Sequence, residues 1–177
     1  MTNNNHATYT TSLGLIRIDY FESTVFSIKF CVATDKSATG RSTDESERVN
    51  NPFTDLVASQ LQEYFDGART HFTFKFELQG TKFQQKVWRA LCTIPYAERR
   101  TYKDIAIEIG SPLASRAVGM ACNRNPMMIV VPCHRVVGSN GRLVGYAGGI
   151  DLKEKLLSIE SDRGSIYPAP LSQIQSL

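Results

Sequence analysis

Residues 101–135 read TYKDIAIEIGSPLASRAVGMACNRNPMMIVVPCHR, and the order of patterns in this stretch decides the fold of the second half of the chain. A capping box at Thr101 opens a helix with apolar residues at helical spacing, and Gly110 ends it. Ser111-Pro112 favours the start of another helix, which we expect to run to about Asn123. Two helices joined by a tight turn predict a helix-turn-helix unit.

The second of these helices is rich in small residues, with Arg116 as its one long, reaching side chain. Tight packing against another helix would explain the small residues. A helix slim enough to lie in a narrow DNA groove would explain them equally well, and Arg116 with them. The small residues are Ala114, Ala117, Gly119 and Ala121.

A thiol follows the two helices. The apolar run 127–131 predicts a short buried strand, which Pro132 would end because proline has no N–H for a sheet ladder. Cys133 and His134 come next, a nucleophile beside the base that usually activates it. Neighbours in an extended chain point to opposite faces, so we expect a local turn or a relaying water between them. A buried structural cysteine beside a surface histidine is the alternative.

The flanking segments complete this half of the chain. A capping box at Thr81 predicts a helix with one apolar face, which Pro95 ends. The glycine-containing stretch 136–145 predicts a mobile loop beside the thiol. Asp151 is expected to cap a last helix that has Glu160 at its end, and 165–177 reads as a tail.

The first half predicts a small sheet with one helix packed on it. Segments 7–11 and 15–20 alternate as a hairpin, and 24–33 is rich in β-branched and aromatic residues. Segment 34–51 is small and polar, which indicates a loop. Asn51-Pro52 then opens a helix, and 71–78 alternates as a half-buried strand or an extended connection.

Composition limits the class of protein. Residues 1–80 contain 7 Lys/Arg and 10 Asp/Glu, whereas 81–177 contain 13 and 7. A basic second half suits a polyanionic partner, but charge alone favours a solvated surface of mixed charge. The four cysteines form no CxxC pair, which excludes a disulfide framework or a zinc site by spacing. The N-terminus has no basic and apolar regions of a secretory signal, and no stretch has the length of a membrane span. We expect a cytoplasmic protein, or a nuclear one if eukaryotic, that is not secreted and binds no metal.

These residues resemble a known family, the O6-alkylguanine-DNA alkyltransferases, also called methylated-DNA–protein-cysteine methyltransferases. The resemblance extends from Phe83 to Glu160 and rests on FQQKVWRAL, TYKDIA, SRAVGMACNRNP, IVVPCHRVVGSNG and GYAGG…LLSIE, in that order. It implies an α+β fold, with an N-terminal ribonuclease-H-like sheet-plus-helix domain. A mostly helical, winged-helix-like DNA-binding domain that carries the cysteine would follow. It also implies a suicide reaction without a cofactor.

The resemblance assigns roles by position. Cys133 would accept the alkyl group from O6 of guanine, His134 would take the thiol proton through a water, and Glu160 would orient His134. Tyr102 and Arg116 would flip the damaged nucleotide out of the duplex and fill the gap, while the small residues face the minor groove. Residues expected to line or support the pocket are Asn125, Met128, Arg135, Val136, Ser139 and Tyr146. Without the resemblance, Glu160 reads as a solvated helix-end carboxylate and Tyr146 as a core aromatic.

Met128 departs from the family pattern, because many relatives have proline there, and this leaves open which alkyl groups fit. The zinc ligands of some relatives are also missing from this sequence. Three rival interpretations remain. One is a lesion sensor without chemistry, although Cys133 is present. A transcription factor would read the major groove with bulkier side chains, and a Cys-His hydrolase would need an oxyanion hole.

We therefore expect a scaffold domain at 1–80, an alkyltransferase and DNA-binding domain at 81–165 and a tail at 166–177. The expected partner is double-stranded DNA containing O6-alkylguanine, and no membrane. We expect a monomer in solution; acceptance of O4-alkylthymine and cooperative binding along DNA stay open.

Overall fold

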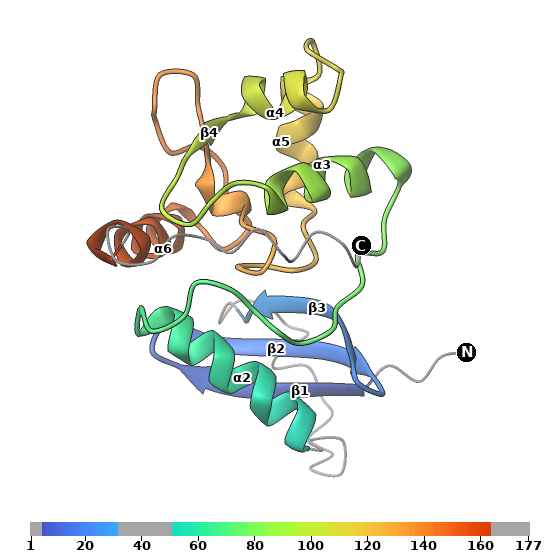
Figure 1. Ribbon diagram of the computed structural model, residues 1–177, viewed down its shortest axis with the longest axis vertical. Coiled ribbons are helices and arrows are strands. Elements are labelled where there is room, and N and C mark those ends of the chain that lie inside the picture. The colour runs from blue at the N-terminus through green and yellow to red at the C-terminus, as the bar shows by residue number, and fades with distance from the viewer. Residues whose placement is uncertain (1–4, 32–50, 164–177) are drawn as a thin grey trace. The chain divides into compact units, whose positions relative to one another are not determined.

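The computed structural model describes residues 5–31 and 51–163 (Figure 1). The chain divides into two compact units, 1–77 and 78–177, and each is described by itself. Most of the predicted loop at 34–51 and the predicted tail at 166–177 lie outside the described residues. The predicted boundary between two domains, at residue 80, stays a prediction.

Unit 1 contains an antiparallel sheet in the order β1-β2-β3, formed by β1 (Asn5–Thr11), β2 (Gly14–Phe21) and β3 (Thr24–Phe30). The register pairs Thr11 with Gly14, which confirms the predicted hairpin. Alternation along β2 sends Ile16, Ile18 and Tyr20 into the core. The predicted third strand is confirmed as β3.

Helix α2 (Pro52–Phe65) lies across one face of this sheet (Figure 1). It begins where the sequence predicts, because the Asn51 side chain accepts a hydrogen bond from the Thr54 backbone N–H at 2.9 Å. The Asn51 amide also donates to the Tyr20 hydroxyl at 2.8 Å, which ties the start of the helix to β2. Buried residues of α2 that complete the core include Val57, Leu61, Tyr64 and Phe65.

The alternating segment 71–78 follows as an extended connection. Among the described residues it pairs with the sheet only through one bridge, between Val25 and Phe76. Its side chains still alternate in burial, with Phe74 and Leu78 buried and their neighbours more exposed. The pattern therefore predicted the orientation of the side chains rather than a full strand.

Three helices of unit 2 pack against one another: α3 (Lys82–Cys92), α4 (Tyr102–Glu108) and α5 (Ser115–Asn123). The capping boxes at Thr81 and Thr101 are both confirmed. The Trp88 indole N–H donates to the Ala121 carbonyl at 2.9 Å and joins α3 to α5. The small residues of α5 therefore serve tight helix packing in part.

The start of α5 differs from the prediction. Residues 111–114 form a turn, in which the Ala114 N–H donates to the Ser111 carbonyl at 2.8 Å. Helix α5 begins only at Ser115, and its N-cap Ala114 has no side-chain cap. Proline at the second position suits a β-turn as well as a first helical position, so Ser111-Pro112 did not distinguish the two.

The buried strand predicted at 127–131 is wrong. The segment is a tight turn in which the Val131 N–H donates to the Met127 carbonyl at 2.9 Å. Ile129, at its centre, has a φ of 75°, a left-handed conformation that is rare for a β-branched residue. The segment is apolar because it is buried, and burial alone does not distinguish a strand from a buried turn.

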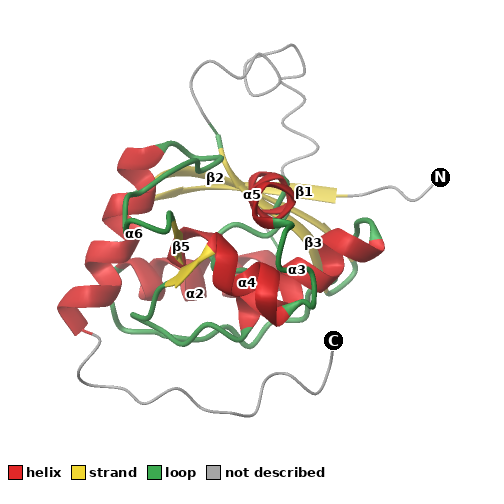
Figure 2. Ribbon diagram, turned by 90° about the horizontal axis from the view of Figure 1, so that it is seen from above, coloured by secondary structure: helices red, strands yellow, loops and turns green. Residues whose placement is uncertain are grey.

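A short 3₁₀ turn, η2 (Cys133–Arg135), follows, so Pro132 precedes a turn rather than ending a strand. The predicted mobile loop at 136–145 begins as β5 (Val136–Val137), which pairs in parallel with β4 (Arg100–Thr101) (Figure 2). Strands of two residues leave no periodic signal in a sequence.

The last helix, α6 (Ile150–Arg163), begins before Asp151, which therefore lies in its first turn and is not the cap. The predicted fold class is confirmed: a sheet-plus-helix unit and a mostly helical unit, α+β. None of the helices described in 5–31 and 51–163 is both long enough and apolar enough to cross a bilayer.

Gly80 tests the packing of unit 2, because a Cβ placed there would lie 2.6 Å from two ring carbons of Trp88. We expect Gly80→Ala to displace the indole and to lower the free energy of unfolding by about 1–3 kcal/mol. Trp88 is the only tryptophan of the chain, so its fluorescence reports both the displacement and the unfolding. Gln79→Ala, at the exposed neighbour, is the control. An unchanged emission spectrum in the glycine variant would contradict this packing.

Candidate active site

Cys133 opens η2 and is 4% exposed. The side-chain amide of Asn125 donates to its Sγ at 3.1 Å and to the Val131 carbonyl at 2.8 Å. The side-chain oxygen of Asn125, Oδ1, accepts from the Met127 N–H at 2.9 Å. One buried side chain thus closes the turn before the thiol and places a donor on the sulfur.

Burial is the largest influence on the Cys133 thiol and raises its pKa. The Asn125 hydrogen bond and the positive charge of Lys153 act in the opposite direction, because both stabilise a thiolate. A thiol in this position is inert until a base takes its proton, and the Asn125 amide is then already placed to donate to the thiolate sulfur.

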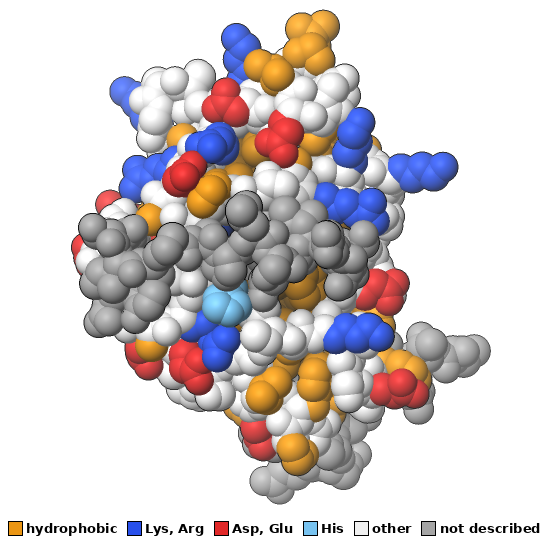
Figure 3. Space-filling view, viewed as in Figure 1, with side chains coloured by type: hydrophobic (Ala, Val, Ile, Leu, Met, Phe, Trp, Pro, Cys, Tyr) orange, Lys and Arg blue, Asp and Glu red, His pale blue; other side chains and the backbone are white. Residues whose placement is uncertain are grey.

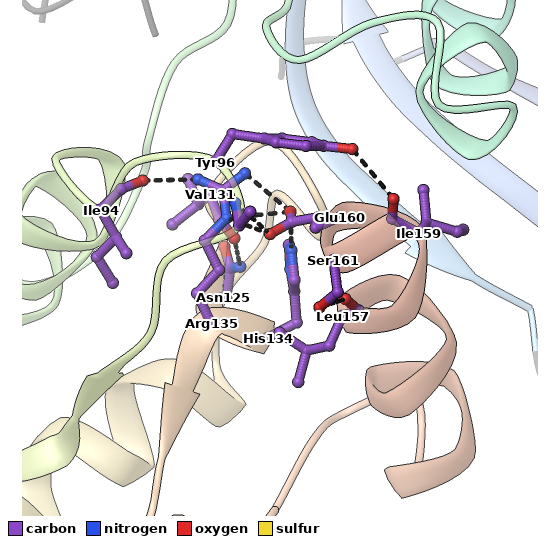
Figure 4. Close-up of polar contacts among 11 residues, drawn as sticks. Ile94, Tyr96, Asn125, Val131, His134, Arg135, Leu157, Ile159, Glu160 and Ser161 are labelled. Atoms are coloured by element: carbon purple, nitrogen blue, oxygen red, sulfur yellow. Dashed lines mark hydrogen bonds and ion pairs between the residues drawn. The ribbon is translucent and has the colours of Figure 1, made fainter. Parts of the chain in front are cut away.

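The neighbouring imidazole and a carboxylate form a buried pair (Figure 4). His134 Nε2 lies 2.9 Å from Glu160 Oε1, and both side chains are fully buried. Glu160 also accepts from Arg135 Nε at 3.0 Å and Nη2 at 2.9 Å, and from the Ala97 N–H at 3.1 Å. The carboxylate, predicted from the residues alone to be solvated, is enclosed by donors.

Arg135 is held in turn by the loop after α3 (Figure 4). Its Nη1 donates to the Ile94 carbonyl at 2.6 Å, and its guanidinium lies 5.6 Å from the centre of the Tyr96 ring. The Tyr96 hydroxyl donates to the Ile159 carbonyl of α6 at 3.4 Å. Arg135 therefore supports Glu160 from behind.

These contacts set the protonation states. Burial by itself would raise the pKa of Glu160, but the hydrogen bonds from His134 and Arg135 and the positive charge of Arg135 outweigh it and lower that pKa to about 2. Burial lowers the pKa of His134, so the imidazole is neutral at pH 7. A carboxylate only accepts, so Nε2 carries the proton and Nδ1 is the basic nitrogen.

A cavity of about 320 Å³ opens beside the thiol, a volume within the range of small-molecule sites. The Tyr102 hydroxyl donates to the Val144 carbonyl at 3.0 Å across part of its lining. Burial raises the pKa of Tyr102 to about 12, so this hydroxyl keeps its proton at pH 7. The cavity is lined by Tyr102, Arg116, Gly119, Met120, Cys122, Asn123, Cys133, Val144, Gly145 and Tyr146.

Helix α5 presents an exposed face beside this cavity. Arg116 is exposed and has no hydrogen-bond or ion-pair partner among the described residues, and Ala117 and Met120 are exposed on the same face. Leu113 is 100% exposed in the turn before the helix. On the face of unit 2 that Figure 3 shows, Lys and Arg side chains are spread apart, with acidic side chains between them.

Several predicted site residues lie elsewhere. Ala121 is 2% exposed in the contact with α3 and offers almost no surface to DNA, and Ala114 lies in the turn before α5. Three other predicted residues are not among the described residues that line the cavity: Met128, Val136 and Ser139. Met128 and Val136 are buried, and Ser139 is exposed in a turn. Their predicted contacts with a base came from the resemblance alone.

Lys153 of α6 was missed. It is fully buried, and its Nζ donates to the Val136 carbonyl at 2.6 Å, the Val144 carbonyl at 3.1 Å and the Gly145 carbonyl at 3.5 Å. The available signal was its position, directly after Leu152 and three residues before Leu156, on the apolar side of the helix. In the described residues, no group of three His, Cys, Asp or Glu side chains could hold a metal ion.

Comparison with known proteins identifies the family. Residues 82–162 match the family model "6-O-methylguanine DNA methyltransferase, DNA binding domain", and residues 5–78 match the ribonuclease-like domain of the same family. A methylated-DNA–protein-cysteine methyltransferase of Methanosarcina barkeri is 55% identical over 113 residues, which are 64% of this chain and 72% of that protein. The chain belongs to the 6-O-methylguanine DNA methyltransferase family.

Solved structures of this family agree over nearly the whole chain. The Mycobacterium tuberculosis O6-methylguanine methyltransferase has a TM-score of 0.77 at 39% identity, covering 96% of this chain and 98% of that one. The same organism's enzyme in complex with DNA has a TM-score of 0.76 at 40% identity, covering 90% and 94%. The predicted family and its two-part fold are therefore confirmed.

Glu160→Gln tests the buried charge cluster. Its lowered pKa contributes stability that is present above the ordinary pKa of 4.5 and is lost as the pH falls towards about 2. We expect the variant to be less stable than the wild type at pH 7 by about 3 kcal/mol, and the difference to shrink between pH 4.5 and 2.

Denaturant unfolding at pH 7, 4 and 3 measures this difference. Glu154→Gln removes an exposed carboxylate from the same helix and should change little at any of these values. A difference between Glu160→Gln and the wild type that stays constant with pH would contradict the lowered pKa.

Proposed function

We infer that this protein is a methylated-DNA–protein-cysteine methyltransferase, which repairs DNA by transferring an alkyl group from O6 of guanine to its own Cys133. Family membership carries the reaction. The buried Cys133 beside a cavity, with Asn125 on its sulfur and a neutral His134 next in the chain, supports the choice of acceptor.

The transfer is a displacement at the alkyl carbon. His134 takes the thiol proton at Nδ1, which we place through one water, and Glu160 holds the imidazole and stabilises the cation that forms. Sγ then bonds to the alkyl carbon as the carbon–O6 bond breaks, and the electron pair of that bond goes to O6. The guanine is restored on protonation, and the thioether stays on Cys133, so each molecule reacts once.

Access to a buried thiol requires the base to leave the duplex, at a cost of a few kcal/mol. The exposed face of α5 would lie in the minor groove through Ala117 and Gly119, where readout is degenerate. Tyr102 would press on the target phosphate, and Arg116, exposed at the cavity, would fill the gap. Tyr146 and the neighbouring wall would hold the flipped base.

The partner that follows is double-stranded DNA containing O6-alkylguanine, and we place the protein where DNA is held, in the cytoplasm or in a eukaryotic nucleus. We propose that the protein is a monomer in solution and that it needs no cofactor. Asn125 and Arg135 act as supports of the thiol and of Glu160 rather than as contacts to the base.

The deciding experiment is the intact mass of the protein after mixing with duplex DNA that contains O6-methylguanine. We expect a gain of about 14 Da, the mass of a methyl group replacing a hydrogen in the thioether, on the Cys133 peptide. Cys133→Ala should lose this gain while still binding the lesion. Cys92→Ala, at a thiol outside the cavity, is the control. Tight lesion binding without a mass gain in the wild type would indicate a lesion sensor instead.

Arg116→Ala tests the proposed gap filler. Free O6-benzylguanine is not stacked in a duplex, so it leaves no gap when it enters the cavity. The variant should therefore react more slowly with duplex DNA, by about tenfold or more, but normally with free O6-benzylguanine. Arg124→Ala removes the same charge at the exposed C-cap of α5 and controls for electrostatic attraction. Equal slowing on both substrates would contradict the role.

A further inference from the structure

The turn between α3 and β4 packs on the buried ion pair of Arg135 and Glu160, and we call residues 94–97 the support loop (Figure 4). The Ile94 carbonyl accepts from Arg135 Nη1 at 2.6 Å, and the centre of the Tyr96 ring lies 5.6 Å from the guanidinium carbon. Two other nitrogens of the same guanidinium, Nε and Nη2, donate to Glu160 at 3.0 and 2.9 Å. Arg135 is thus bound by the loop and by the carboxylate at once.

The support loop also contacts the carboxylate directly. The Ala97 N–H donates to Glu160 Oε2 at 3.1 Å, and Ala97 has a φ of 64°, in the left-handed region. A residue with a side chain rarely adopts this backbone, which persists where the surrounding contacts fix it. The Tyr96 hydroxyl donates to the Ile159 carbonyl at 3.4 Å, next to Glu160 in α6. Both contacts tie the loop to the helix that carries the carboxylate.

The charges around His134 decide whether it can act as a base. Burial lowers the pKa of His134, whereas the hydrogen bond and the negative charge of Glu160 raise it. The positive charges of Arg135 and Lys153 lower it again. Because a protonated imidazole cannot take the Cys133 proton, transfer depends on this balance between one carboxylate and the cations near it.

Two further titratable groups near this cluster are neutral at pH 7. Burial raises the pKa of Cys92, at the end of α3, to about 11, and it raises the pKa of Tyr146, in the cavity wall, well above 10.0. The charge of Arg135 acts on the Cys92 thiol, and that of Glu160 acts on the Tyr146 hydroxyl. Neither group can neutralise Glu160, so Arg135 is its counter-charge.

We propose that Tyr96 is a positioning residue: it holds Arg135 against Glu160 and thereby keeps the neighbouring base able to take a proton in mildly acidic solution. The inference rests on the proposed function. Without the ring, the guanidinium can turn away, and the negative charge of Glu160 then acts on His134 with less opposition. His134 is then protonated at a higher pH. Since the reaction needs the neutral imidazole, transfer is lost first on the acid side.

Tyr96→Leu tests the proposal, because it removes the ring and the hydroxyl but keeps an apolar side chain. The rate of Cys133 alkylation by O6-benzylguanine, followed by mass, is measured between about pH 4.5 and 8.5. We expect the acid limb of the profile to move up by about 0.5–1 pH unit, so that the rate on that limb falls about three- to tenfold and the rate at about pH 8 stays within about twofold. Tyr96→Phe, which keeps the ring over the guanidinium, should restore most of the wild-type profile.

Glu98→Gln is the matched control, because it removes an exposed charge next to the support loop, where Glu98 pairs with Arg100 at 3.0 Å. Its profile should coincide with that of the wild type. Thermal unfolding shows whether each variant is folded; if Tyr96→Leu is not, Tyr96→Met is measured under the same criterion. A folded variant whose acid limb stays within about 0.2 pH unit of the wild type, whatever its rate, would overturn the proposal, because the ring would then have a structural role only.

Nuclear magnetic resonance of the imidazoles gives a second readout that needs no reaction. The chain has three histidines, and His6 and His71 lie in unit 1, so they serve as internal references. In Tyr96→Leu the protonation midpoint of His134 should rise by the same amount as the acid limb, while the references stay in place. An unchanged midpoint would overturn the proposal. A wild type that fails to react with O6-benzylguanine and with methylated DNA alike would instead contradict the proposed function and leave this titration interpretable, so the two failures are distinguishable.

Discussion

The carboxylate of Glu160 is the constraint on which the rest of unit 2 depends. It has no access to water, and an uncompensated charge in that position would cost several kcal/mol. Its donors come from segments far apart in the sequence: Ala97 after α3, and His134 and Arg135 in η2. The helices must therefore pack in one arrangement, because any other leaves a buried charge without its partners.

The proposed chemistry uses the same contacts. A carboxylate that satisfies Arg135 also fixes the orientation and tautomer of His134, so structural support and the proton transfer that we propose depend on one side chain. Asn125 plays the corresponding part for Cys133, since it closes the preceding turn and donates to the sulfur. Lys153 extends the scheme from side chains to backbone, because it binds carbonyls of the cavity wall.

Local patterns predicted much of this, and their failures have a common cause. Capping boxes at Thr81 and Thr101 and the hairpin before Ile16 depend on neighbouring residues, so the sequence shows them directly. The strand predicted at 127–131 is wrong because its apolar residues report burial, while a buried asparagine decides the shape of the chain. The depth of Glu160 and the three bonds of Lys153 depend on contacts between distant segments, which no spacing in the sequence encodes.

The position of α6 near the end of the chain has a consequence for a protein in which, as proposed, the thiol reacts only once. Cys133 leaves the ribosome before Glu160 and Lys153, because synthesis proceeds from the N-terminus. Until α6 docks, His134 lacks the carboxylate that orients it, and the sulfur lacks the nearby charge that favours its thiolate. A nascent chain therefore carries an ordinary thiol, which has neither an oriented base nor the burial of the folded site until the last helix docks.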